Sequence, residues 1–133
     1  MTETSHNGVF LQWEEVRKMA GSGLVTFGSH TDSHKILTSL NEEEIHEELI
    51  KSKETLISES AVHPSFIPFS YPNGNYDEKV VRMVKDAGYH IAVTTENGWN
   101  DSETPPFHLR RMAIHQDMSS TKEMFGCRIT NIF

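Results

Sequence analysis

The stretch that decides the fold is Gly23-Leu24-Val25-Thr26-Phe27-Gly28, which runs directly into Ser29-His30-Thr31-Asp32-Ser33-His34. Its first half is short, apolar, rich in β-branched residues and bounded by glycines, a composition typical of a buried strand that ends at Ser29. His30 and His34 therefore follow the carboxyl end of this strand. In α/β folds, the loops that carry function gather at that end of the sheet.

The rest of the chain alternates between helical and strand patterns. Helices are expected at residues 13–20, 42–58, 77–87 and about 119–127, and further strands at 65–70, 90–94 and 111–115. In the helix at 42–58, an apolar stripe of Ile45, Leu49 and Leu56 should face the core while the charged remainder faces water. Pro68 indicates a strand start, edge or bulge. The alternation predicts parallel strands covered by helices.

Composition limits the class of protein. With 133 residues and no long polar tract, the chain is expected to form one domain, residues 1–133. A net charge of -7 argues against a nucleic-acid partner, and the single cysteine, Cys127, excludes an intramolecular disulfide. No apolar run reaches membrane-spanning length and the N-terminus lacks the regions of a secretion signal, so the chain as given is expected to be cytoplasmic.

Two imidazoles four residues apart after a strand form a candidate half of a metal site. Catalytic zinc usually takes three protein ligands and leaves one position for water, so a third ligand would have to come from elsewhere. The zinc-protease helix pattern does not fit, because Thr31 stands where that pattern has Glu. The alternative is a pair of ordinary surface histidines in a chain that has eight.

Three segments follow one another along the chain: His30-Thr31-Asp32-Ser33-His34, Phe69-Ser70-Tyr71-Pro72-Asn73-Gly74 and Leu109-Arg110-Arg111-Met112-Ala113-Ile114. Their order and spacing resemble those of the polysaccharide deacetylases, the carbohydrate esterases related to nodulation-type chitooligosaccharide deacetylase. Connecting pieces agree as well: Trp13-Glu14-Glu15-Val16, Leu37-Thr38-Ser39-Leu40 and Val84-Lys85-Asp86-Ala87-Gly88-Tyr89. The resemblance covers nearly the whole chain from Leu11 onward.

The resemblance implies an α/β fold, a partial or irregular (β/α) barrel. It also implies a divalent ion held by an Asp and two His, and hydrolysis of N-acetyl or O-acetyl groups on carbohydrate. His30 and His34 match the two histidine ligands. Neutral imidazole suits zinc, the expected ion, and also cobalt or nickel.

Further residues match the family's substrate groove and catalytic groups. Tyr71, Pro72 and Asn73 match the groove segment, and Trp99 is a further candidate for substrate binding. The backbone N–H of Asn73 matches the donor that holds the developing oxyanion. The composition of this turn would equally suit a plain strand-to-helix connection. Arg111 matches an arginine near the site, and His115 lies where a general acid could project, although a structural role suits His115 as well.

One family motif has no counterpart. The family's first motif, a Thr-Phe-Asp-Asp-Gly type strand end, supplies a general base and the third metal ligand. Before His30 the only carboxylates are Glu3, Glu14 and Glu15, and Asp32 is poorly placed to replace the pair. The chain therefore resembles the C-terminal portion of a deacetylase with its first strands missing. Without a base, hydrolysis should be slower by roughly 10²- to 10⁴-fold.

The alternative is a non-catalytic remnant that binds a metal or a glycan. Open sheet edges carry unpaired N–H and C=O groups that tend to pair with another chain, so a homo-oligomer is expected in either case. A plain α/β interaction domain with coincidental histidines is a third possibility, and its stability would not depend on metal.

Overall fold

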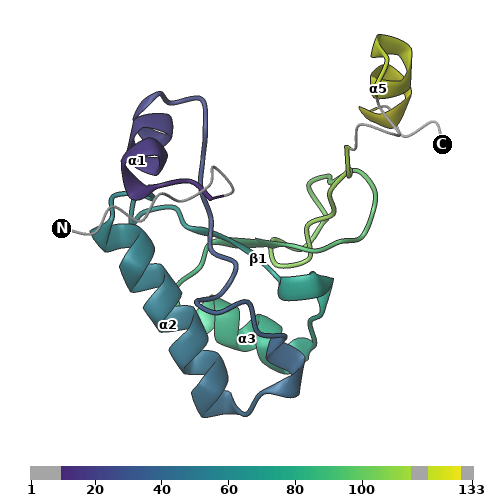
Figure 1. Cartoon of the computed structure of the whole chain (residues 1–133). Coiled ribbons are helices and arrows are strands. Elements are labelled where there is room, and N and C mark those ends of the chain that lie inside the picture. Colours follow the sequence, from purple (N-terminus) through teal and green to yellow (C-terminus); the bar gives the residue numbers. More distant parts are fainter. Residues whose placement is uncertain (1–9, 115–119, 130–133) are drawn as a thin grey trace.

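The computed structural model describes residues 10–114 and 120–129 (Figure 1). The helices are α1 (Trp13–Gly21), α2 (Glu42–Ser58), α3 (Glu78–Asp86) and α5 (Lys122–Ile129), with short 3-10 turns η1 (Leu37–Ser39) and η2 (Pro72–Gly74). The strands are β1 (Pro68–Ser70) and β2 (Ile91–Val93). Helices and strands alternate through the centre of the chain as the sequence predicts.

The two strands are parallel, and two further segments extend their pairing. β1 pairs with β2 in the register Pro68 to Ile91. Single parallel bridges join Ser29 to Phe69 on one side and Val93 to Leu109 on the other. Four segments thus lie side by side in chain order, and Ser29, Ser70 and Thr94 are at or next to the same end of the pairing.

One hydrophobic core lies between the strands and the helices α2 and α3, which are both below the strands in the view of Figure 1. Alternate residues of the β1 region point into it, and all three are almost fully buried: Ile67, Phe69 and Tyr71. α2 contributes Ile45 and Leu49, and α3 contributes Val80 and Val84. Burying side chains of this size contributes about 1.5–3 kcal/mol each.

Local signals explain where the helices begin. The Asn41 side chain accepts a hydrogen bond from the Glu44 backbone N–H at 3.0 Å, and the Glu44 carboxylate accepts one from the Asn41 N–H at 3.0 Å. This reciprocal capping box satisfies two N–H groups that have no partner inside the helix. Asp77 caps α3 in a similar way through the N–H of Val80 at 2.8 Å.

Two strand predictions are wrong. Residues 23–28 do not form a buried strand: Leu24 is 90 % exposed, and no backbone hydrogen bond joins 25–28 to any other described residue. Residues 111–114 are not a strand either, because the pairing with β2 occurs at Leu109, and residue 115 lies outside the described part of the chain. A strand is stabilised by its neighbours, and the described residues supply none beside 23–28.

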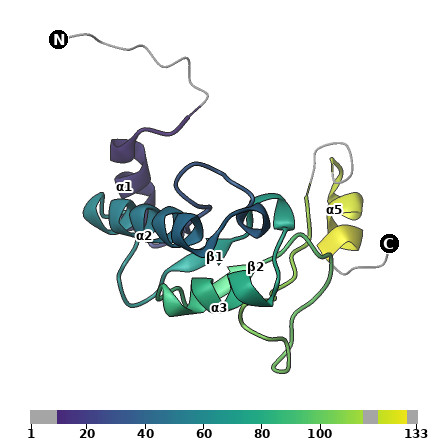
Figure 2. The same cartoon turned by 90° about the horizontal axis from the view of Figure 1, so that it is seen from below.

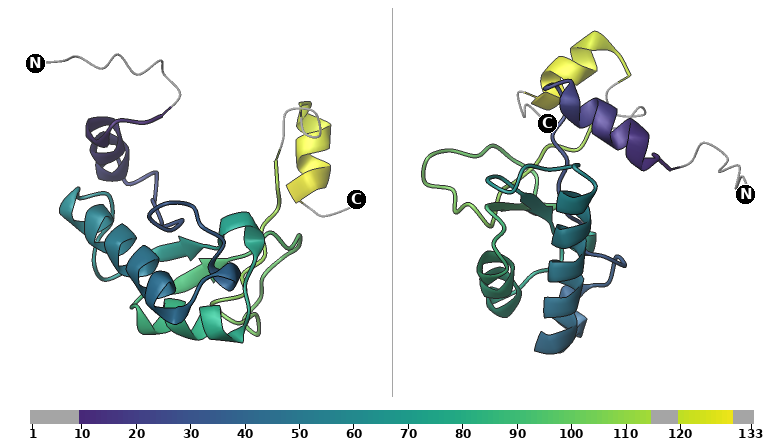
Figure 3. Two further views of the ribbon diagram at one scale, coloured as in Figure 1. Left: turned by 60° about the horizontal axis from the view of Figure 1, so that its bottom comes forward. Right: turned by 90° about the vertical axis from the view of Figure 1, so that its left-hand side faces the viewer.

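The fold is therefore α/β with parallel strands and covering helices, and the described strands do not close into a barrel. Figures 2 and 3 show α5 standing apart from the strands and from α2 and α3. The expected helix at 119–127 is found as α5, although residue 119 is not described. None of the helices in the described ranges is long and apolar enough to cross a membrane.

Candidate active site

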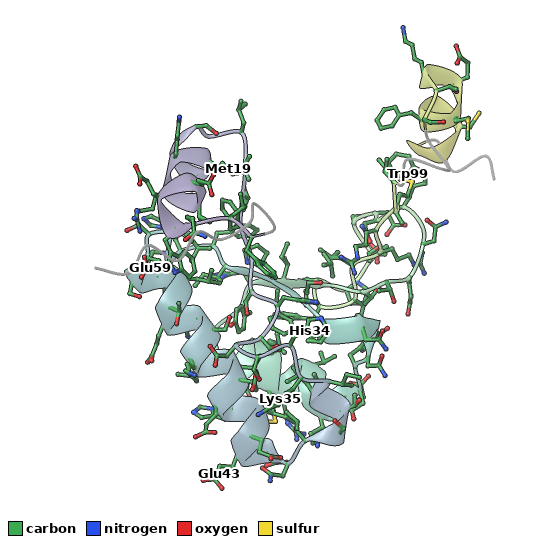
Figure 4. All side chains as sticks on the ribbon, in the orientation of Figure 1. Met19, His34, Lys35, Glu43, Glu59 and Trp99 are labelled. Carbon is green, nitrogen blue, oxygen red and sulfur yellow. The ribbon has the colours of Figure 1, made fainter. Side chains whose placement is uncertain are left out.

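His30 and His34 lie next to each other at the end of the parallel strands. Their ring centroids are 4.8 Å apart and the planes are inclined by 63°. Figure 4 shows His34 near the centre of the molecule, close to the end of the sheet. Both residues are exposed, so the two rings can reach a ligand from solvent. The loop after Ser29 therefore brings together the pair that the sequence singles out.

The tautomer of His30 is fixed by its surroundings. Its Nδ1 lies 2.7 Å from the carbonyl oxygen of Ser70. A carbonyl can only accept a hydrogen bond, so Nδ1 must carry the proton and the neutral ring keeps its lone pair on Nε2. Metal-binding histidines commonly donate their other ring N–H to such a carbonyl. The lone pair on His30 Nε2 is therefore available to coordinate a cation.

A buried hydrogen-bond network supports the residue before His30. The hydroxyl of Ser29 lies 2.8 Å from the hydroxyl of Ser52 on α2 and 3.0 Å from the hydroxyl of Tyr89. Tyr89 also lies within 2.8 Å of the Leu49 carbonyl oxygen. Burial raises the pKa of Tyr89, although hydrogen bonds with Ser29 and Ser52 lower it in part. The network ties the start of the histidine loop to α2.

One backbone donor in the turn after β1 has no partner among the described residues. Asn73 has φ 56 and ψ 10, a left-handed conformation that asparagine tolerates better than most residues. Its neighbours close the turn through Gly74 N–H to Tyr71 O and Asn75 N–H to Pro72 O, but no described residue accepts a hydrogen bond from the Asn73 N–H. Asn73 is exposed. The geometry is therefore compatible with donation to an external oxyanion.

Tyr71 and Pro72 form the first part of this turn. Both are almost fully buried, and the Tyr71 hydroxyl donates to the Phe107 carbonyl oxygen at 3.0 Å. Burial is the main reason that the pKa of Tyr71 is raised far above its usual range. In this conformation the two residues support Asn73, and direct contact between either of them and a substrate stays a prediction.

Arg111 is held at the end of the strands. Its Nε donates to the Thr94 carbonyl oxygen at 2.6 Å, and its backbone N–H donates to Glu96 O at 3.0 Å. Trp99 is 58 % exposed, and Figure 4 shows it well apart from His34, on the side of α5. His115 lies outside the described residues. The roles assigned to these three residues stay predictions.

The described residues contain no group of three or more His, Cys, Asp or Glu side chains placed to hold one metal ion. Asp32, between the two histidines, pairs instead with Lys51 at 2.6 Å. The hydrogen bond and charge of Asp32 raise the pKa of Lys51. The donor set for a cation is therefore two imidazoles, with further ligands to be supplied from outside this set.

Sequence reasoning missed two features near the site. Glu48 was expected to face water, yet it is 5 % exposed and contacts the histidine loop. Its position, three residues after Ile45 and four before Ser52, places it on the buried face of α2, so helical periodicity is the signal that could have found it. An open pocket of about 380 Å³ was also missed, and Tyr76, Glu96, His108 and Arg110 are among the residues that line it.

Comparison with known proteins decides the family. The family model for polysaccharide deacetylase matches residues 2–92, well over half of the chain. The chain belongs to the polysaccharide deacetylase family. YxkH from Bacillus subtilis (strain 168), which is named after the same family, is 29 % identical over 119 residues. That match covers 90 % of this chain and 41 % of YxkH.

Solved deacetylase structures share the fold. Streptococcus pyogenes deacetylase PplD, solved in complex with acetate, superposes with a TM-score of 0.79 at 22 % identity and covers 92 % of this chain. BC0361, a polysaccharide deacetylase from Bacillus cereus, superposes with a TM-score of 0.75 at 31 % identity and covers 90 %. The chain spans 52 % of the first structure and 36 % of the second, so it corresponds to part of a longer polysaccharide deacetylase fold.

Proposed function

We propose that this polysaccharide deacetylase domain takes part in metal-dependent hydrolysis of acetyl groups on an N-acetylated or O-acetylated carbohydrate. His30 and His34 would hold the ion, with zinc the first choice and cobalt or nickel as alternatives. The observation that carries the proposal is the His30 ring, which lies 4.8 Å from that of His34 while its Nδ1 faces the Ser70 carbonyl oxygen. The family membership supports the same chemistry.

Asn73, Arg111 and His115 would each have a separate role in the hydrolysis. A bound divalent ion acts as a Lewis acid on the acyl carbonyl. The N–H of Asn73, which has no acceptor among the described residues, would donate to the oxygen on which negative charge develops, where a fixed donor stabilises the transition state most. Arg111 would add positive charge at the same end of the strands. His115 would protonate the leaving amine.

The second candidate is a domain that binds metal or glycan without turning substrate over. It is favoured by the donor set, because the described residues supply two ligands instead of three. In this case binding would persist and acetate release would not occur.

A metal titration followed by an activity assay separates these candidates. Isothermal titration with zinc should show binding that His30→Ala abolishes, while His46→Ala, which changes an exposed histidine of α2, should bind as well as the wild type. Release of acetate from an N-acetylglucosamine oligomer would then support the enzymatic function. Binding without release at any enzyme concentration would leave the non-catalytic domain. Absence of binding by the wild type would rule out the metal proposal for this chain.

We also propose that the chain self-associates through residues 23–28. Within this segment, the backbone groups of residues 25–28 have no hydrogen-bond partners among the described residues, and the side chains of Leu24 and Val25 are exposed. Exposed strand edges of this kind pair readily with another chain. Light scattering after size exclusion should give a dimer or larger oligomer that Leu24→Lys weakens, while Leu11→Lys, at another exposed leucine, does not. A monomeric wild type would contradict this proposal.

A further inference from the structure

The loop between the two histidines has an unfavourable backbone conformation. Thr31 has φ 69 and His34 has φ 62, in the left-handed region that residues with side chains rarely adopt. Thr31 is β-branched, which makes that region still less favourable for it. Such conformations persist only where the surrounding structure holds them. Something outside the loop must therefore compensate for the strain between His30 and His34.

Glu48 on α2 supplies two direct contacts to the middle of this loop. Its Oε2 accepts a hydrogen bond from the Ser33 backbone N–H at 2.8 Å, and its Oε1 accepts one from the Ser33 hydroxyl at 2.5 Å. Lys35, just past His34, places its Nζ 3.1 Å from the same Oε1. The side chain of Glu48 is only 6 % exposed. The buried Glu48 carboxylate thus contacts the residues on both sides of His34, Ser33 and Lys35.

The electrostatics agree with a charged Glu48. Burial by itself raises the pKa of this carboxyl, but the hydrogen bonds from Ser33 and the interaction with Lys35 more than offset it, so the pKa lies below its usual value. Hydrogen bonds to an ionised acceptor are shorter and stronger than those between neutral groups. The loop is therefore held by a carboxylate.

We infer that Glu48 is a positioning residue that keeps the rings of His30 and His34 together by bracing the Ser33 backbone between them. The inference deepens the proposed function, because the purpose of the arrangement would be to present two imidazoles to one ion. Glu48 itself is no candidate for the third ligand, since both of its oxygens already accept contacts from Ser33 and Lys35. Partners that orient metal ligands typically change metal affinity about 10- to 100-fold when they are removed.

The test compares Glu48→Ala and Glu48→Gln with Glu47→Gln, a matched control at the exposed neighbour on α2. The first measurement is the NMR contact between the two imidazole rings in the full-length, metal-free chain. The second is cobalt(II) affinity by titration. Glu48→Ala should weaken the ring contact and lower cobalt affinity about 10- to 100-fold. Glu48→Gln should restore part of both, because its remaining oxygen can still accept from Ser33, and Glu47→Gln should change neither.

A role in stability alone would give a different pattern. Glu48→Ala would then lower the melting temperature while the ring contact and the cobalt affinity stayed as in the wild type, and this result would overturn the inference. If the wild type binds no cobalt, the proposed metal function fails and the ring contact alone decides the role of Glu48. If Glu48→Ala does not fold, Ser33→Ala tests the same brace from the loop. Loss of the ring contact in Ser33→Ala would support the inference, and an unchanged contact would contradict it.

Discussion

Ser70 contacts both the ring of His30 and the backbone of the residue before it. The Ser70 carbonyl oxygen lies 2.7 Å from His30 Nδ1, while the Ser70 N–H donates to the carbonyl oxygen of Ser29 at 2.8 Å. One residue of β1 therefore fixes both the backbone just before His30 and the orientation of its ring. β1, which follows the histidine loop after α2, thus determines which ring nitrogen of His30 is available to a ligand.

This relationship predicts the tautomer of His30. In its neutral form, His30 should carry its proton on Nδ1, because the Ser70 carbonyl oxygen cannot donate a hydrogen bond. Long-range ¹H–¹⁵N NMR distinguishes the two ring nitrogens directly. His46, exposed on α2, supplies the reference for a solvated imidazole. A protonated Nε2 at His30 would show that the ring is turned away from Ser70.

Gly74→Ala should destabilise the turn that contains Asn73. Gly74 has φ 73, and a Cβ at this position would lie 2.1 Å from Thr95 Oγ1 and 2.9 Å from Thr95 Cβ. The expected loss is at least about 1–3 kcal/mol in the free energy of unfolding, measured by urea denaturation. Gly21→Ala is the matched control, because nothing lies within 4 Å of its added Cβ and it ends a helix. Equal effects of the two variants would contradict the steric argument.

Alkaline pH should weaken the fold through two buried tyrosines. Burial raises the pKa of Tyr71 and of Tyr89 above the value of about 10 expected in the unfolded chain. Above about pH 10 the unfolded state therefore loses these protons before the native state does. In this range the native state binds more protons than the unfolded state. The free energy of unfolding is therefore unaffected below pH ~10 and falls as the pH rises further.

Urea denaturation of wild type and of a Tyr71→Phe/Tyr89→Phe variant at about pH 8 and about pH 11 checks this expectation. The wild type should lose more stability between the two values than the variant, because both proteins share every other titrating group. The variant should start lower, since it lacks the Tyr71 bond to Phe107 O and the Tyr89 bonds to Ser29 and Leu49. Equal losses of stability in the two proteins would show that the tyrosines do not cause the pH dependence.

Asn41→Ala should lower stability by removing the cap of α2. The variant loses the acceptor for the Glu44 N–H, and such replacements cost about 0.5–2 kcal/mol. Thermal unfolding followed by circular dichroism measures the loss. Glu44→Gln serves as control, because glutamine can still accept from the Asn41 N–H in a capping box. A melting temperature for Asn41→Ala equal to that of the wild type would show that α2 is held by packing alone.

Helix limits are the part of the fold that local sequence predicts well. α2 begins after Asn41 and ends at Ser58 as expected, and α3 lies inside the predicted range 77–87, with Gly88 in a left-handed conformation just beyond it. Caps, glycines and helical periodicity act over a few residues, so they can be recognised without knowing the rest of the fold. The expected strands at 65–70 and 90–94 also exist, shortened to β1 and β2.

Strand predictions fail where the outcome depends on a neighbour. Residues 23–28 have the composition of a buried strand, yet Leu24 is 90 % exposed and only Ser29 pairs with β1. The pairing expected at 111–115 occurs at Leu109 instead. Backbone hydrogen bonds of a strand lie between segments, so composition cannot decide whether the partner is there.

The sequence by itself determined the alternation of helices and strands, the family resemblance and the choice of His30 and His34, because each rests on residue type at a fixed spacing. Only the tertiary structure decided that the two rings meet, that Ser70 sets the tautomer of His30 and that Glu48 contacts Ser33. The last two contacts join residues 40 and 15 positions apart in the chain. Their geometry depends on how α2 and β1 pack around the core, which no local pattern encodes.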